Sequence, residues 1–380
     1  MTGPAYPAAR AVARTLEEHF ARHIAAARAQ GRQGLAPEPD AAAIEATVEA
    51  GFWASLRREE GYSPKISLAF LPPESAARPL VFDRRMPLAP ASLTKLAPAV
   101  ERPGIHLGVW RDGGGLYVWG ATRAIPKFCF VLEVVEPGLL VVKYRRGLDA
   151  VKFSNVAVLS GDQVRVVDEG GSGLPDCPAL VESLVGFGLP SADDDSVNAL
   201  VQLAVSMREH KRGGTLLVVP ETSEEWRESI LQPVAYAIDP PHGELAELLE
   251  REAGAGRDGS DWREALRRAV DAVAGLTAVD GAALINRRFE LLAFGAKIGR
   301  REGHMRVEQV ILTEPVVGDV PSVVNPVLLG GTRHLSAAQF VQDQRDSVAL
   351  VASQDGRFTV FAWSPCEGMV HAHRVEALLM

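Results

Sequence analysis

The sequence predicts two domains in series: an α+β domain with antiparallel strands over residues 1–170, and an α/β domain with a mixed sheet flanked by helices over residues 177–380. The chain has 380 residues, more than one compact core commonly holds. Its first half passes from helical periodicity to short alternating runs, and its second half alternates strands with helices. The polar stretch EGGSGLPD at 169–176 is the best boundary, because it offers nothing that packs a core.

The first half begins with helices and continues with strands. Apolar residues recur at helical spacing within 8–30, and a second helical stretch covers 41–58. A strand is expected at 66–71. Between 104 and 167, runs rich in Val, Leu, Phe and Tyr are separated by DGGG, EPG and SGD, which predicts antiparallel strands joined by tight turns. We therefore expect helices first and then a β-meander.

The second half has the alternation typical of a layered α/β domain. The expected helices cover 197–210, 243–253, 262–276 and 336–344, and the expected strands cover 213–220, a pair within 280–298 and a hairpin at 347–363.

Composition and charge exclude several classes of protein. The hydrophobic fraction of 47% and charged fraction of 23% exclude a largely disordered or collagen-like chain. The 40 basic and 48 acidic residues leave a net charge of −8, so non-specific nucleic-acid binding is not expected. The three cysteines are far apart, with no CxxC pair, which indicates reduced thiols.

No segment predicts a membrane location. Arg10 and Arg14 are not followed by the apolar stretch of a signal peptide, and the apolar runs fall short of the roughly 20 residues that span a bilayer. We therefore expect a cytoplasmic protein that does not enter the membrane.

The segment LLGGTRHLSAAQF, 328–340, is the most informative in the chain. The glycines Gly330 and Gly331 let the backbone turn sharply, and Thr332, Arg333 and His334 follow at the start of a predicted helix. Unpaired N–H groups and the helix dipole attract phosphate there, and an arginine adds a bidentate grip. The alternative is a capped helix whose arginine pairs with a nearby carboxylate.

A second candidate is Asp280, followed by Gly281 at the start of the strand pair 280–298. A carboxylate at a strand edge can hold a divalent metal and accept a proton. Equally, Asp-Gly is one of the commonest turn dipeptides. Both interpretations stay open on the dipeptide alone.

Four sequence blocks that occur in a fixed order favour the functional interpretation of both candidates. Together they make the region from 195 to 365 resemble the catalytic domain of diadenylate cyclases. The blocks are MREHKRGGTLLVVP (207–220), DGAALINRRFELLAFGAKI (280–298), GTRHLSAA (331–338) and SVALVAS (347–353). They match, in turn, the family's RxGALIV-type strand, its DGA motif with the following hairpin, its GTRHRAA motif and its valine-rich strand ending in serine.

The resemblance implies a mechanism and assigns roles to residues. Two ATP molecules would be condensed to cyclic di-AMP and two pyrophosphates with Mg²⁺ or Mn²⁺, by two domains that face one another in a homo-oligomer. Asp280 would bind the metal and activate the 3′-hydroxyl, and Arg333 and His334 would share in catalysis. The implied nucleotide-binding residues are Gly281, Ile298, Gly331, Thr332, Arg333, His334 and Ser353.

The chain also departs from the family pattern. Leu335 stands where the family has the second arginine of RHR, and a longer insertion at 240–276 precedes the DGA block. A catalytically degenerate module that binds a nucleotide without turnover is therefore the alternative.

The first half resembles, more loosely, the sensor domains of the DACNV type that precede diadenylate cyclase domains in bacteria. The resemblance covers AGFWASLRREEGYSPKISLAFLPP (50–73) and the strands around Trp110, Trp119 and Lys152-Phe153. It implies a regulatory sensor. The aromatic residues there are expected to be core residues in preference to a ligand cage.

Overall fold

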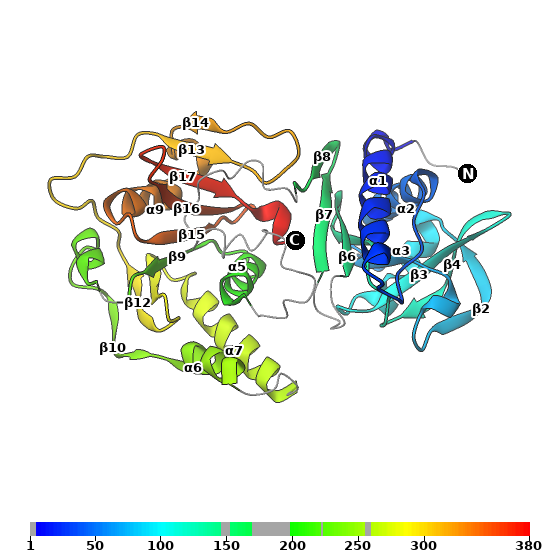
Figure 1. Cartoon of the computed structure of the whole chain (residues 1–380), viewed down its shortest axis with the longest axis horizontal. Coiled ribbons are helices and arrows are strands. Elements are labelled where there is room, and N and C mark those ends of the chain that lie inside the picture. The colour runs from blue at the N-terminus through cyan, green and yellow to red at the C-terminus, as the bar shows by residue number, and fades with distance from the viewer. Residues whose placement is uncertain (1–4, 146–152, 169–197, 222, 255–259) are drawn as a thin grey trace. The chain divides into compact units, whose positions relative to one another are not determined.

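The computed structural model describes residues 5–145, 153–168, 198–221, 223–254 and 260–380 (Figure 1). The chain divides into two compact units: the described residues up to Val167 form unit 1, and those from Asp168 onward form unit 2. Each unit contains a mixed sheet with helices, so the chain is mixed α/β. The predicted boundary stretch, 169–176, lies outside the described residues.

Unit 1 has an eight-stranded sheet in the order β2-β4-β3-β1-β5-β6-β7-β8. Its described elements are α1 (Pro7–Ala29), α2 (Ala41–Ser55), β1 (Ile66–Phe70), η1 (Pro73–Ser75), β2 (Leu80–Pro87), α3 (Pro90–Val100), β3 (His106–Asp112), β4 (Gly115–Thr122), β5 (Phe130–Glu136), β6 (Leu139–Arg145), β7 (Phe153–Ser160) and β8 (Gln163–Val166).

The meander expected over 104–167 is interrupted by an earlier strand. β1 lies between β3 and β5, parallel to β3 and antiparallel to β5. All five residues of β1 are buried, which suits the middle of a sheet. The apolar pattern of β1 predicted a strand, but periodicity carries no information about which strands pair across the sheet.

Helices cover one face of this sheet. Phe20 of α1 contacts Phe130 of β5 in an edge-to-face pair, inside a core that also includes residues of α2 and α3. On the other face, Trp119 is buried and its Nε1 donates to the Leu71 carbonyl at 2.7 Å. Trp119 is thus a core residue, as expected. Phe52 stacks on Tyr6 with ring centroids 3.7 Å apart.

A buried histidine makes unit 1 sensitive to acid. His106 is 3% exposed, and a 2.7 Å hydrogen bond joins its Nδ1 to Ser67 Oγ. Burial, together with the charges of Lys143 and Arg145, lowers the pKa of His106 from 6.5 to about 4. The unfolded chain therefore binds the proton more readily, and the stabilising contribution of neutral His106 is complete above pH 6.5 and is lost as the pH falls towards 4.

We expect acidification from pH 7 to pH 5 to cost unit 1 about 2 kcal/mol through His106. Urea unfolding of the wild type and of His106→Gln at both pH values measures this contribution as the difference between the two pH dependences. His373 of unit 2, whose pKa burial lowers to about 3, contributes equally to both proteins. Identical pH dependences would show that His106 is not the responsible group.

Unit 2 has a nine-stranded sheet in the order β10-β12-β11-β9-β15-β16-β17-β13-β14. Its described elements are α5 (Ala199–Glu209), β9 (Gly214–Val219), η2 (Glu225–Ser229), β10 (Tyr236–His242), α6 (Glu244–Gly254), α7 (Ser260–Leu276), β11 (Ala282–Asn286), β12 (Leu291–Ala296), β13 (Val310–Thr313), β14 (Ser322–Val324), α8 (Val327–Gly330), α9 (Thr332–Asp343), β15 (Val348–Ala352), β16 (Phe358–Ser364), β17 (Met369–Arg374) and η3 (Glu376–Leu378).

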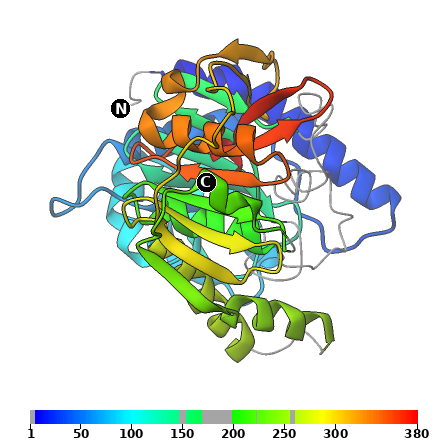
Figure 2. The same cartoon turned by 90° about the vertical axis from the view of Figure 1, so that its left-hand side faces the viewer.

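The central strands of this sheet are covered on both faces, as Figure 2 shows by the separation of α9 from α6 and α7. Leu216 and Val218 of β9 face the core formed with α5, α6 and α7, whereas Leu217 and Val219 face the core under α9. Alternating residues thus serve opposite cores, which explains the continuous apolar run at 213–220.

The predicted elements of unit 2 are present, but one helix starts at a different residue and four strands, β10, β13, β14 and β17, were not expected. The helix expected at 336–344 begins earlier, at Thr332. The short strands β13 and β14 were not expected, because three or four residues give too little alternation to recognise. In the part of the chain that the structure describes, no helix is both long enough and apolar enough to cross a membrane.

Candidate functional site

The sheet of unit 2 brings the predicted residues to one edge. β9 and β11 are parallel, and β15 and β12 are antiparallel to them. The starts of β9 and β11 therefore lie beside the ends of β15 and β12. Asp280 and Gly281 precede β11, Ile298 follows β12 and Ser353 follows β15. This topology collects residues that are far apart in the sequence.

Helix α9 begins at the same edge. A methyl group on Gly213, just before β9, would lie 3.1 Å from Arg333 Nη1 and 3.3 Å from the Ala352 carbonyl oxygen at the end of β15. Arg333 is the second residue of α9, and its charge also acts on Asp280. Arg333 is thus the side chain that links the helix terminus with the edge of the sheet.

Asp280 is the anionic group of this edge. Its side chain is 91% exposed and forms an ion pair with Lys297. The hydrogen bond and charge of Lys297, with a smaller contribution from Arg333, hold the pKa of Asp280 below its usual range. Asp280 is therefore ionised at neutral pH and open to a ligand from solvent.

Gly281 fits a position that no other residue can take without rearrangement. Its φ is +118°, and a Cβ there would lie 2.5 Å from the carbonyl carbon of Gly295. Glycine lets the backbones of β11 and β12 approach closely at this point. The close approach fixes Asp280 beside the end of β12.

The start of α9 has the turn that the two glycines predicted. Gly331 precedes the helix with φ +79° and ψ −156°. Thr332 is exposed at the first helical position. The N-cap residue Gly331 makes no side-chain capping bond, and the N–H groups of a first helical turn have no partner within the helix.

His334 points inward, away from this open edge. It is 1% exposed, its Nδ1 donates to the Gly330 carbonyl at 3.0 Å, and Thr359 Oγ1 lies 3.4 Å from its Nε2. Burial lowers the pKa of His334, so the ring is neutral. In this arrangement His334 holds the Gly330–Gly331 turn, and its direct contact with a triphosphate stays a prediction.

The remaining predicted residues are partly buried. Ser353 closes a turn in which its N–H donates to the Arg357 carbonyl at 2.9 Å. Ile298 packs on the core under α9 and pairs with Ile230 in an isolated bridge. Both lie next to the edge, but their contacts with a nucleotide are not tested by this geometry.

The side chains at this edge do not form a complete metal site by themselves, but they fit a divalent cation that is also bound by the phosphates of a nucleotide. Among the described residues, no group of three or more His, Cys, Asp and Glu side chains is placed to hold a metal ion. Mg²⁺ is commonly held by one or two carboxylates together with substrate phosphates. Asp280 can supply the one carboxylate, and phosphates would have to supply the other anionic ligands.

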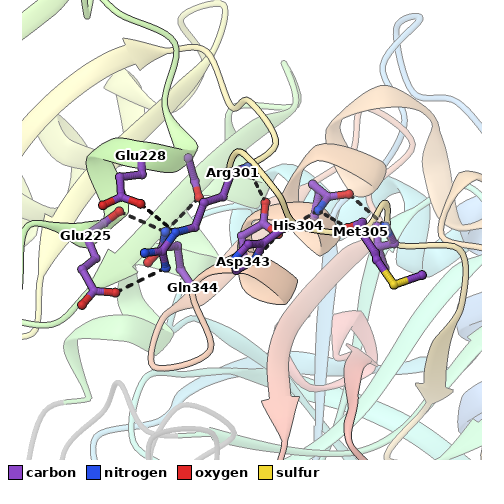
Figure 3. A network of polar contacts seen from close by, with 10 residues as sticks. Glu225, Glu228, Arg301, His304, Met305, Asp343 and Gln344 are labelled. Carbon is purple, nitrogen blue, oxygen red and sulfur yellow. Dashed lines mark hydrogen bonds and ion pairs between the residues drawn. The ribbon is translucent and has the colours of Figure 1, made fainter.

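A polar network ties the other end of α9 to the segment that follows β12 (Figure 3). Asp343, the last residue of α9, has a fully buried side chain. It accepts from the Arg301 backbone N–H at 2.9 Å and from Gln339 Nε2 at 3.0 Å, and His304 Nδ1 lies 3.2 Å away.

The same network reaches η2. Figure 3 shows Arg301 beside two glutamates, with Nε 2.7 Å from Glu228 and Nη1 3.4 Å from Glu225. Gln344 Nε2 donates to the Glu225 carbonyl at 3.0 Å. The network thus joins the two segments that carry site residues: α9, which carries Arg333, and the segment after β12, which carries Lys297 and Ile298. It therefore helps to fix the position of one segment relative to the other.

Asp343→Ala is expected to lower the free energy of unfolding by about 3 kcal/mol, because it removes the acceptor of the Arg301 N–H and of one of the two N–H groups of the Gln339 amide. Urea denaturation measures the loss. Asp346→Ala is the matched control: Asp346 lines the same cavity of about 300 Å³ but is exposed, so its loss should stay within about 0.5 kcal/mol. Equal losses would remove the argument for a buried acceptor.

Neither of the two cavities that we identify in unit 2 is lined by Asp280, Arg333 or Ser353. The larger, about 430 Å³, is lined by Val323, Val324, Val327 and Leu335 together with polar residues of 306–309. Leu335 lines this cavity and packs, partly buried, on the core under α9.

Lys297 and Gly213 are the site residues that the sequence prediction missed. Lys297 is adjacent to Ile298, and the antiparallel pairing of Ala282 with Ala296 places it opposite Gly281, next to Asp280. A hairpin register worked out from the sequence would have been the signal. Gly213 has φ +71°, and the Gly213–Gly214 pair after Lys211 and Arg212 is the corresponding signal.

Comparison with known proteins identifies part of unit 1. Residues 33–123 match the family described as probable sensor domain DACNV. The match spans α2 to β4, so unit 1 contains a DACNV probable sensor domain. No curated protein matches the chain.

Proposed function

We propose that unit 2 is a diadenylate cyclase that condenses two ATP molecules into cyclic di-AMP and two pyrophosphates, and that unit 1 regulates it as a sensor. The supporting observation is that the fold brings Asp280, Arg333 and an uncapped helix N-terminus to one edge of the sheet. A carboxylate beside a helix N-terminus that can bind phosphate suits nucleotidyl transfer, in which a hydroxyl attacks the α-phosphate of a nucleotide.

The residues divide the chemistry between them. The start of α9, with Thr332 and Arg333, would bind and neutralise phosphate oxygens, and His334 would keep the preceding turn in place. Asp280 would accept the proton of the attacking 3′-hydroxyl. A divalent cation, Mg²⁺ or Mn²⁺, would supply charge neutralisation at the phosphates when bound next to Asp280. Ile298, Gly281 and Ser353 would contact the nucleotide.

Ring closure requires two nucleotides, each attacking the other. The resemblance to diadenylate cyclases implies one ATP per domain, so we propose that two copies of unit 2 associate face to face. The exposure of Asp280 leaves it open to a nucleotide held by a second copy. We place this reaction in the cytoplasm, where ATP is available.

The alternative function is nucleotide binding without turnover. Leu335 in place of a second arginine and the inward orientation of His334 favour it, because both reduce the cations that face a triphosphate. Such a module would pass nucleotide occupancy to a partner.

Incubation of the full chain with ATP and Mg²⁺ or Mn²⁺, followed by chromatography of the products, tests the proposal. Cyclic di-AMP is the expected product. Tight ATP binding by calorimetry with no cyclic dinucleotide would select the binding module. If ATP neither binds nor yields a product, both functions are excluded.

A further inference from the structure

Lys297 is the positively charged residue that forms an ion pair with Asp280. Its ammonium pairs with Asp280 Oδ2, and the two residues flank the start of β11 and the end of β12. The backbone of Lys297 is held from the other side as well, because its carbonyl accepts from the Leu231 N–H at 2.8 Å. Neighbouring Ile298 pairs with Ile230. The position of this lysine is thus built into the sheet.

We propose that Lys297 is the resident counter-ion of Asp280: it competes with a divalent cation for the carboxylate in the ligand-free chain, and nucleotide phosphates remove this competition. The inference rests on the metal-binding role proposed above for Asp280. It adds a competition for the carboxylate that the motif does not contain.

The charges support this competition. Without nucleotide, a divalent cation would meet one carboxylate whose oxygen is already paired with an ammonium, next to the further positive charge of Arg333. Like charges disfavour its entry, and the described residues offer no cluster of other metal ligands. A divalent cation alone should therefore bind weakly.

A nucleotide reverses these conditions. Its phosphates bring several oxygen ligands for the cation and a negative charge that attracts the ammonium of Lys297. The side chains of Lys297 and Asp280 are 51% and 91% exposed, and exposed ion pairs are weak. Lys297 can therefore leave Asp280 at little cost and turn towards the phosphates.

Titration with Mn²⁺, followed by the electron paramagnetic resonance signal of the free ion, tests the inference without turnover. In the absence of nucleotide, Lys297→Met is expected to bind Mn²⁺ about fivefold more tightly than the wild type, as the loss of one competing contact between two unit charges in water implies. With α,β-methylene-ATP, the wild type should bind Mn²⁺ tightly and this advantage should disappear, because Lys297 then faces phosphate.

Two variants make the result specific. Arg300→Met removes one exposed positive charge that is not among the groups acting on Asp280, and it should leave Mn²⁺ affinity at the wild-type value. The double variant Asp280→Asn with Lys297→Met should lose the gain. Equal Mn²⁺ affinity of Lys297→Met and the wild type, or a gain that survives in the double variant, would overturn the inference. If the gain is found but ATP yields no cyclic dinucleotide, the inference stands and the cyclase activity alone is refuted.

Discussion

Asp280→Asn should lower the formation of cyclic dinucleotide from ATP by about a hundredfold or more, while the melting temperature stays at the wild-type value. The amide has the shape of the carboxylate but neither holds a divalent cation well nor accepts the proton of a hydroxyl. Asp280 is 91% exposed, so no buried partner loses its hydrogen bond. Product formation by chromatography and thermal unfolding measure the two effects separately.

Asp355→Asn is the control for Asp280→Asn. Asp355 is an exposed carboxylate in the turn after β15, and its replacement should leave turnover largely intact. Full activity of Asp280→Asn would contradict the role of Asp280 in metal binding and proton transfer.

Gly281→Ala, unlike Asp280→Asn, should destabilise the fold and lower the free energy of unfolding by about 4 kcal/mol. The new Cβ would meet the carbonyl carbon of Gly295 at 2.5 Å and the carbonyl oxygens of Gly295 and Ala296 at 2.8 Å. These are backbone atoms, so no side-chain rotation relieves the contact and the strand pair must separate. Turnover should fall as well, since Asp280 moves with the hairpin.

Gly318→Ala separates crowding from backbone strain. Gly318 has φ +86°, but a Cβ there would meet nothing within 4 Å. Its replacement should cost only the left-handed conformation, about 1 kcal/mol. If urea denaturation gives the same loss for both glycines, the close approach of β11 and β12 is not what requires Gly281.

The local elements could be predicted well from the sequence, but their pairing could not. The helices α1, α5 and α7 and the hairpin β11–β12 follow from periodicity and turn residues, which act between near neighbours. The insertion of β1 between β3 and β5 depends on contacts between residues far apart in the chain. An apolar run predicts that a strand is buried, not which strands lie beside it.

The same limit applies to the site. Asp280 and Thr332-Arg333 were identified by residue type and motif order, and the fold does bring Asp280 and Arg333 to one edge. The inward orientation of His334 was not predictable, because it depends on Thr359 of β16 and on the Gly330 carbonyl. Lys297 was missed because its role comes from hairpin register and not from a motif.

The order of residues in the 380-residue chain was enough to predict two parts: one resembling DACNV sensor domains, which the family match over residues 33–123 supports, and one for which we predicted a cyclase from motif order. These are properties of residue order and spacing. Which of the motif residues face solvent and which face the core became clear only from the tertiary structure, as did the ion pair between Lys297 and Asp280. The physical reason is that a side chain's charge and exposure depend on the strands and helices packed around it, and those neighbours are distant in sequence.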